Sequence, residues 1–133
     1  MLKRVFDMIC SLAGLIVLAP ILMAIAAIIK FDSPGPVFFR GVRSGRWGKP
    51  FRVYKFRTMV VNAESLGGHS TPDDDPRLTR SGAFLRRVKL DELPQLINVL
   101  KGEMSIVGPR PQVSWAVENY TSEERVLLTV RPG

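Results

Sequence analysis

The longest apolar stretch of the chain lies near its N-terminus. Residues 8–29 contain no charged side chain. As a straight helix they would be about 33 Å long, which is enough to cross the roughly 30 Å core of a bilayer. Pro20 lies near the middle of the stretch, where a proline removes a helical hydrogen bond and clashes with the preceding turn. The pattern therefore predicts a membrane-embedded helix that is kinked at Pro20.

Basic residues flank this stretch on both sides. They are Lys3 and Arg4 before it and Lys30, Arg40, Arg43 and Arg46 after it. Because cationic flanks tend to stay on the cytoplasmic side, we expect a re-entrant helix that enters the membrane, breaks at Pro20 and returns. A straight span and a cleaved signal peptide are the alternatives, although the apolar run is longer than a usual signal core. A buried helix of a soluble protein is disfavoured, since so short a chain offers little surface to cover it.

Beyond residue 32 the pattern changes to short apolar segments separated by turn-forming residues. A Pro- and Gly-containing turn at 32–36 ends the apolar helix. The expected strands and the hairpin loop between them are 37–39, 51–57 and 41–50. The expected helices are 81–89, 94–101, 113–120 and 123–129. Residues 104–107 are expected to form a short buried strand or an extended segment.

These elements predict a mostly helical α+β fold. Its parts are a re-entrant membrane-anchoring helix at 1–32 and a compact globular domain with a short β-hairpin at 33–133. Within the first of the later helices, Ala83, Phe84, Leu85 and Val88 are expected to pack inward, because their spacing suits one helix face.

Residues 60–75 form a polar segment with the spacing of an exposed loop. The run Asp73-Asp74-Asp75 suggests a divalent cation site, but a solvated acidic loop is the preferred interpretation. His69 is the only histidine and has no cysteine or histidine partner nearby in the sequence, which disfavours a zinc site.

The charge balance favours an anionic partner. Lys and Arg number 19 against 12 Asp and Glu, which gives a net charge of +7. Nucleic acid, an anionic membrane surface and a nucleotide substrate all fit this excess. Most charges between residues 30 and 57 are basic, so this segment suits anionic headgroups, and Lys55 is the candidate for binding a phosphate. Cys10 is the single cysteine and excludes an intramolecular disulfide.

The segment 82–111 carries the candidate chemistry. Asp91 and Glu92 are adjacent, and basic residues lie on both sides of them: Arg86, Arg87, Lys89 and Arg110. The pair falls at or just before a predicted helix start, where exposed amides favour negative charge. Fixed cations hold phosphate oxygens, and carboxylates hold a metal or act as nucleophiles. A solvated helix face with ordinary ion pairs explains the same residues, so both interpretations remain open on charge alone.

Several motifs occur in order along the whole chain. They are KRVFD (3–7), VYKFRTM (53–59), DPRLTRSG (75–82), LRR (85–87), LDELPQL (90–96), NVLKGEMS (98–105) and VGPRP (107–111). Together they resemble the bacterial sugar transferases that start glycan assembly on a lipid, the monotopic polyprenol-phosphate phosphoglycosyl transferases.

The resemblance implies a two-step transfer that initiates polysaccharide or glycoconjugate synthesis. Asp91 attacks the β-phosphate of a nucleotide diphosphate sugar, expected to be a UDP-sugar, and a nucleoside monophosphate leaves. The sugar phosphate then passes from Asp91 to polyprenol phosphate. The resemblance also places Mg²⁺ beside Asp91 and Glu92, and assigns phosphate contacts to Lys55, Arg86 and Arg110.

The resemblance further implies a protein of the bacterial inner membrane, with 33–133 as a catalytic domain that faces the cytoplasm and contacts membrane lipids. The family has a Ser-Pro pair at its helix break, where this chain has Ala19-Pro20. Family members usually continue past the segment equivalent to 130–133, so we expect this catalytic domain to be incomplete at its C-terminus. The alternative is a non-catalytic truncated paralogue acting as a basic membrane-anchored protein. A nucleic-acid binder ranks third, because no established nucleic-acid module is present, and we expect no nucleic-acid partner.

Overall fold

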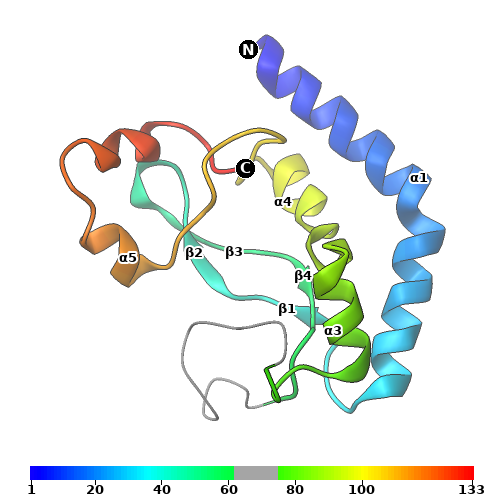
Figure 1. Cartoon of the computed structure of the whole chain (residues 1–133). Coiled ribbons are helices and arrows are strands. Elements are labelled where there is room, and N and C mark those ends of the chain that lie inside the picture. Colours follow the sequence, from blue (N-terminus) through cyan, green and yellow to red (C-terminus); the bar gives the residue numbers. More distant parts are fainter. Residues whose placement is uncertain (62–74) are drawn as a thin grey trace. The chain divides into compact units, whose positions relative to one another are not determined.

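The structure is a computed structural model and describes residues 1–61 and 75–133. Its helices are α1 (Leu2–Asp32), α3 (Arg80–Arg87), α4 (Gln95–Lys101) and α5 (Ser114–Glu118), with 3-10 turns η1 (Arg46–Gly48), η2 (Leu90–Glu92) and η3 (Glu124–Thr129). Its strands are β1 (Phe38–Phe39), β2 (Val42–Ser44), β3 (Pro50–Arg52) and β4 (Lys55–Phe56). The strands form two antiparallel pairs, β1 with β4 and β2 with β3 (Figure 1). A mostly helical α+β fold is therefore confirmed.

Helix α1 continues without interruption through Pro20. Its most apolar window has a mean hydropathy of 2.8 and is only 11% buried, so within the described residues it is long and apolar enough to cross a membrane. The helix does not end at Pro20, where a break was expected. A proline can bend a helix without ending it. A re-entrant path through the membrane stays a prediction.

The chain forms two compact units, each with its own core. The first unit contains residues 1–17, 40–54 and 95–133, and the second contains 18–39 and 55–94. Helix α1 contributes its first half to one unit and its second half to the other. The predicted division at residue 32, between a membrane anchor and a catalytic domain, concerns function and stays a prediction.

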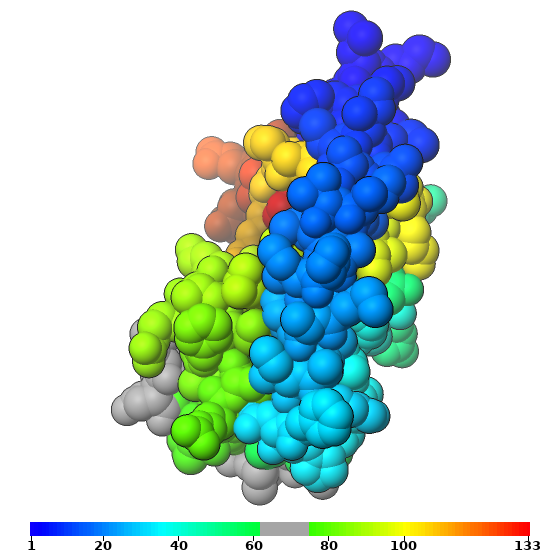
Figure 2. Space-filling model, turned by 90° about the vertical axis from the view of Figure 1, so that its right-hand side faces the viewer, coloured from blue at the N-terminus to red at the C-terminus, as the bar shows by residue number. Residues whose placement is uncertain are grey.

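The second unit is built around the last turns of α1. Ile25 and Ile29 of α1 pack with Phe56 of β4 and Leu85 of α3 in one buried cluster. Strand β1 confirms the strand expected at 37–39, and its Phe38 stacks on Phe56 with ring centroids 5.6 Å apart. Figure 2 shows α3, in green, at the surface beside the second half of α1, in light blue. Apolar burial by α1 therefore fixes both β4 and α3.

Helix α3 packs through a face that is narrower than the sequence suggests. A Cβ on Gly82 would lie 2.0 Å from the carbonyl oxygen of Thr58, so only glycine permits this approach. Leu85 is 3% exposed, as expected, but Phe84 and Val88 are 59% and 45% exposed. The expectation that these two pack inward is wrong, because they lie one turn apart on another face of the helix.

The predicted pairing of 37–39 with 51–57 is present only as β1 with β4, in the second unit. The first unit contains a different hairpin, β2 and β3 joined through η1, most of which lies in the segment expected to be a loop, 41–50. The expected strand 51–57 is wrong as a single element, since β3 and β4 belong to different sheets. The buried side chain of Asn98 explains the interruption. Its Oδ1 accepts a hydrogen bond from the Tyr54 amide at 2.8 Å, and its Nδ2 donates to the Arg52 carbonyl at 2.8 Å. A side chain thus satisfies backbone groups that a strand partner would otherwise take.

The remaining helices of the first unit lie close to the positions predicted from the sequence. Helix α4 ends at Lys101 and is followed by Gly102, which has a φ of +92°, as expected for a glycine stop. Met104 packs with Phe51, Val53 and Val99 in the core of this unit. Residues 104–107 form no strand. Met104 and Ser105 are buried as expected, but Ile106 and Val107 lie in a bend and are exposed, so the expected buried segment is only half as long. The last two predicted helices are present in shortened form as α5 and η3.

Candidate active site

Asp91 is a buried carboxylate in η2 of the second unit. It is 5% exposed, and the turn that precedes it passes through Lys89, which adopts a left-handed conformation with a φ of +60°. This backbone conformation is uncommon for residues other than glycine and persists only where the surrounding structure stabilises it. The turn takes the chain directly from α3 into η2, so Asp91 follows closely after Arg86.

Lys55 reaches both acids of the pair. Its Nζ lies 3.4 Å from Glu92 Oε1 and 3.8 Å from Asp91 Oδ2. The Lys55 side chain is 18% exposed, so solvent screens this contact less than it screens a surface ion pair. The next residue of β4, Phe56, is in the core. Because side chains alternate along a strand, burying Phe56 directs Lys55 to the opposite face, where the acids lie.

The surroundings of Asp91 disfavour its charged form. Burial raises the pKa of its carboxyl, and the neighbouring Glu92 charge also raises this pKa, while Lys55 and Arg86 lower it. The net pKa lies above the ordinary value of 3.8. A buried carboxylate with a raised pKa and specific cationic neighbours is the pattern of a functional group rather than of a solvated helix face.

Asp75 is a second buried carboxylate of this unit, with the opposite character. Arg77 Nη2 donates to its Oδ2 at 2.6 Å, Arg77 Nε bonds both carboxylate oxygens, and the Arg77 amide donates to Oδ1 at 2.8 Å. These hydrogen bonds hold the pKa of Asp75 at about 2. Sequence reasoning placed Asp75 in a solvated loop, although the spacing Asp-Pro-Arg was the signal for a local pair. The other residues of that interpretation, His69, Asp73 and Asp74, lie outside the described residues.

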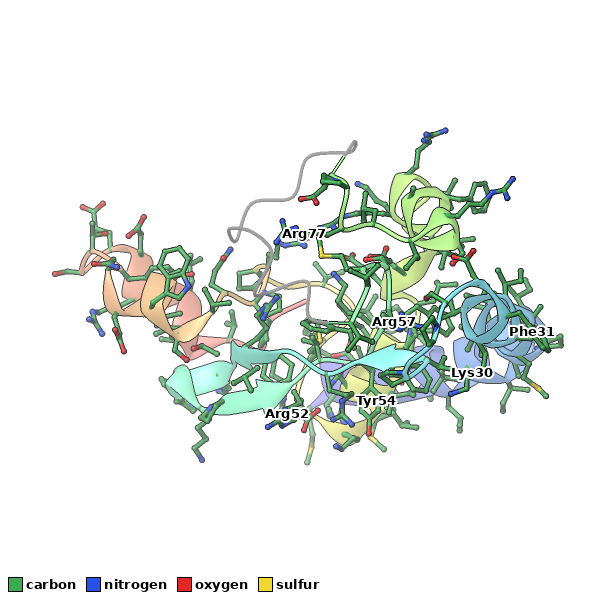
Figure 3. The ribbon with its side chains drawn as sticks, turned by 90° about the horizontal axis from the view of Figure 1, so that it is seen from below. Lys30, Phe31, Arg52, Tyr54, Arg57 and Arg77 are labelled. Carbon is green, nitrogen blue, oxygen red and sulfur yellow. The ribbon has the colours of Figure 1, made fainter. Side chains whose placement is uncertain are left out.

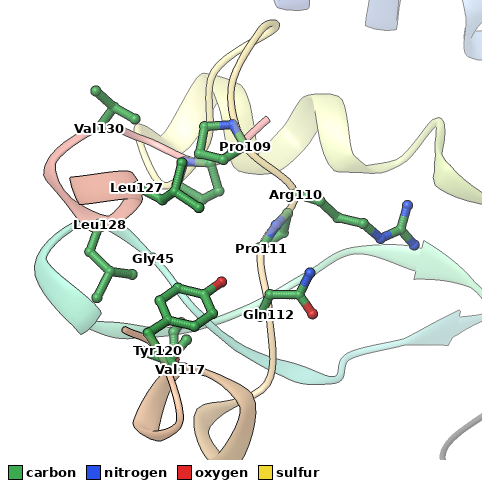
Figure 4. A pocket seen from close by; sticks show the side chains of 12 residues that line it. Gly45, Pro109, Arg110, Pro111, Gln112, Val117, Tyr120, Leu127, Leu128 and Val130 are labelled. Carbon is green, nitrogen blue, oxygen red and sulfur yellow. The ribbon is translucent and has the colours of Figure 1, made fainter. Parts of the chain in front are cut away.

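Four of the sequence-predicted site residues come together in the second unit. Asp91, Glu92 and Lys55 are in contact, and the charge of the half-buried Arg86 lowers the pKa of Asp91. Arg110 belongs to the first unit, where it is exposed and lines a small cavity (Figure 4). Its phosphate contact stays a prediction.

The cavity beside Arg110 is small. Its volume is about 20 Å³, room for roughly one water molecule. Its lining includes Gln112, Val117, Tyr120 and Leu127. Small-molecule sites usually measure about 300–1,000 Å³, so this cavity does not by itself define a substrate site.

The donor set suits a magnesium ion shared with a substrate. Within residues 1–61 and 75–133 no group of three or more His, Cys, Asp or Glu side chains is placed to hold a metal. Asp91 and Glu92 supply two adjacent carboxylates. Mg²⁺ commonly binds through one or two carboxylates together with substrate phosphates, so the pair fits an ion that arrives with a diphosphate.

The fold and the site define an α+β protein with a long apolar helix and a lysine that contacts two adjacent carboxylates, one buried and one partly exposed. The whole chain, residues 1–133, matches the bacterial sugar transferase family, and the protein belongs to that family of sugar-1-phosphate transferases.

Three relatives illustrate the family. The chain is 54% identical, over 82% of its length, to the exopolysaccharide production protein PSS of Rhizobium leguminosarum. It is 48% identical, over 90% of its length, to the UDP-glucose:undecaprenyl-phosphate glucose-1-phosphate transferase of Escherichia coli. It is 41% identical, over 99% of its length, to the UDP-N-acetylgalactosamine-undecaprenyl-phosphate N-acetylgalactosaminephosphotransferase of Aeromonas hydrophila. The chain spans 55%, 26% and 32% of these relatives, respectively.

Proposed function

We propose that this protein transfers a sugar phosphate from a nucleotide diphosphate sugar to polyprenol phosphate. The single observation that carries the proposal is Asp91, a buried carboxylate whose pKa is raised and which Lys55 and Glu92 adjoin. The names of the Escherichia coli and Aeromonas hydrophila relatives support a UDP-sugar donor and an undecaprenyl phosphate acceptor. The reaction would initiate polysaccharide or glycoconjugate synthesis.

The first step is attack of an Asp91 carboxylate oxygen on the β-phosphorus of the donor. A new phosphorus–oxygen bond forms, the bond to the bridging oxygen breaks, and the nucleoside monophosphate leaves with the electron pair. A carboxylate is a weak nucleophile, and its approach to a diphosphate brings negative charges together. Lys55 and Arg86 offset that charge, because both adjoin Asp91. They bind the phosphate oxygens while negative charge develops on those oxygens.

The second step returns the enzyme to its starting state. A phosphate oxygen of polyprenol phosphate attacks the phosphorus of the sugar phosphate held by Asp91. The bond from Asp91 to phosphorus breaks, Asp91 leaves as a carboxylate, and a polyprenol diphosphate sugar is formed. Glu92 keeps Lys55 at the site through both steps, since its carboxylate contacts the lysine directly.

Asp91 and Glu92 would hold Mg²⁺ together with donor phosphate oxygens. The ion supplies positive charge that offsets the diphosphate and the leaving group. Arg110 is proposed as a further phosphate ligand.

Helix α1 is the proposed membrane anchor. Its apolar surface suits lipid, and the basic residues that flank it suit anionic headgroups of the cytoplasmic leaflet. We infer a re-entrant path bent at Pro20 in the bacterial inner membrane, with the catalytic residues on the cytoplasmic side. A basic membrane-anchored protein without catalysis has no need of a buried carboxylate with a raised pKa, which favours the enzyme.

The proposal predicts that Asp91→Asn abolishes release of UMP from a UDP-sugar, because an amide oxygen does not form the covalent intermediate. The assay uses purified protein in detergent with Mg²⁺ and polyprenol phosphate, and measures UMP. Glu118→Gln, at an exposed acid of α5, is the matched control and should keep the wild-type rate within about twofold. UMP release at the wild-type rate by Asp91→Asn would contradict Asp91 as the nucleophile.

A further inference from the structure

The end of α1 is tied to both elements that bring cations to Asp91. Helix α1 ends at Asp32, and the turn 33–36 follows. One contact runs from Asp32 to α3, which carries Arg86, and another joins the turn to the segment that follows Lys55. All of these residues belong to the second unit.

Asp32 caps α3 from outside that helix. Its Oδ2 accepts hydrogen bonds from the Ser81 amide at 2.9 Å and from the Ser81 hydroxyl at 2.8 Å. The first amides of a helix have no partner within it, and Thr79 satisfies another of them, since its Oγ1 accepts from the Gly82 amide at 2.9 Å. The start of α3 is therefore fixed partly by a carboxylate of α1.

Arg57 performs the corresponding task for β4. Its side chain is buried, its Nε donates to the Pro36 carbonyl at 2.6 Å, and its Nη1 and Nη2 donate to the Ser33 hydroxyl at 2.8 Å and the Ser33 carbonyl at 3.0 Å. Figure 3 shows Arg57 beside the end of α1, near Lys30. A planar guanidinium loses little freedom for several hydrogen bonds, so it holds the turn rigidly. Arg57 lies two residues after Lys55.

Apolar packing alone positions β4 and α3 less closely than the hydrogen bonds of Asp32 and Arg57 do. Phe56 and Leu85 lie on the same core cluster as Ile25 and Ile29, and they are the direct neighbours of Lys55 and Arg86. Such packing is non-directional and permits small sliding movements. Hydrogen bonds are directional, so those of Asp32 and Arg57 restrict the sliding of α3 and β4. Lys55 and Arg86 are then held in the geometry that phosphate binding requires.

We propose that Asp32 and Arg57 are positioning residues, which hold Lys55 and Arg86 at Asp91 by joining β4 and α3 to the end of the membrane helix. This inference rests on the proposed function for its catalytic consequence. Its structural part does not, because the joined elements can be observed without turnover. A displacement of the last turn of α1, for example when the helix inserts into lipid, would then move Lys55 and Arg86 together.

The test compares Asp32→Ala and Arg57→Lys with the controls Glu118→Ala and Arg125→Lys, which change exposed residues of the first unit. Backbone hydrogen exchange of the protein in nanodiscs reports on the joined elements. We expect faster exchange in both variants at 55–56 and at 86–87, beyond the residues that lose a hydrogen bond directly. Exchange at these positions equal to that of the controls would overturn the proposal.

Turnover supplies the second measurement. We expect kcat/KM for UMP release to fall about tenfold in both variants, because small misplacements of phosphate ligands weaken transition-state stabilisation. Asp32→Glu keeps the carboxylate and should recover activity to within about threefold of wild type. Faster exchange with unchanged kcat/KM would overturn a positioning role. Faster exchange in a protein whose wild type releases no UMP would refute the proposed function and leave the joining of β4 and α3 to α1 supported.

Discussion

At the scale of single residues, two buried carboxylates of one unit have opposite surroundings. Burial raises the pKa of Asp91, whereas hydrogen bonds from Arg77 hold the pKa of Asp75 at about 2. The surroundings of Asp91 destabilise its ionised form, whereas those of Asp75 stabilise its ionised form. The contrast favours Asp91 over Asp75 as the proposed reactive acid. The sequence alone did not distinguish the two, because arginines occur within five residues of both.

The contrast predicts stability changes of opposite sign at pH 7. Asp91→Asn should raise the melting temperature, because it removes a charge whose burial is incompletely offset. Asp75→Asn should lower it, because Arg77 loses its charged partner while both remain buried. Thermal unfolding of both variants beside wild type measures the two shifts.

Their pH dependence follows from the direction of each pKa shift. For Asp91, whose folded pKa is raised, the cost to stability grows as the pH rises from 3.8 to the folded pKa and is constant above it, so the advantage of Asp91→Asn should disappear as the pH falls to 3.8. The group with the lowered pKa, Asp75, contributes stability above 3.8 that is lost as the pH falls towards 2, so the deficit of Asp75→Asn should shrink in that range. Shifts of the same sign for both variants at pH 7 would contradict this assignment.

At the scale of elements, the apolar pattern predicted most of the helices and the pairing of 37–39 with part of 51–57, because it depends on local periodicity. It did not predict the hairpin of β2 and β3. It predicted neither the outward position of Phe84 nor the separation of β3 from β4. Both depend on residues distant in the sequence: Gly82 meets Thr58, and Asn98 takes the backbone groups of Arg52 and Tyr54. The Asp91–Glu92 pair was visible in the sequence, but the burial of Asp91 and the contact of both acids with Lys55 were not, since no local pattern reports a partner 36 residues away (91 − 55).

The role of Asn98 gives a prediction for these elements. Asn98→Ala leaves the Tyr54 amide and the Arg52 carbonyl without their side-chain partner, and each unsatisfied buried group costs about 1–3 kcal/mol. We expect the free energy of unfolding to fall by about 2–4 kcal/mol in denaturant titration. The control is Asn119→Ala, whose side chain is exposed and bonds only locally to the Trp115 carbonyl. Equal losses for both variants would argue against a special role for Asn98.

At the scale of the whole molecule, a long apolar helix and the pair Asp91–Glu92 occur in one chain. Membership in the bacterial sugar transferase family follows from the match over residues 1–133. The second unit supplies Asp91, Glu92, Lys55 and Arg86, and its core is built on the last turns of α1. This arrangement suits the proposed function, because the proposed membrane anchor packs against β4 and α3, which carry Lys55 and Arg86.

Intact-mass measurement tests whether Asp91 becomes covalently attached to the sugar phosphate, as the proposed function requires. The protein is incubated with a UDP-sugar and Mg²⁺ without polyprenol phosphate, so the second step is blocked. We predict a mass increase equal to one sugar phosphate, located on Asp91 by peptide analysis, absent from Asp91→Asn and lost when polyprenol phosphate is added. The same adduct on Asp91→Asn, or UMP release by a wild-type protein that never carries it, would rule out covalent catalysis by Asp91.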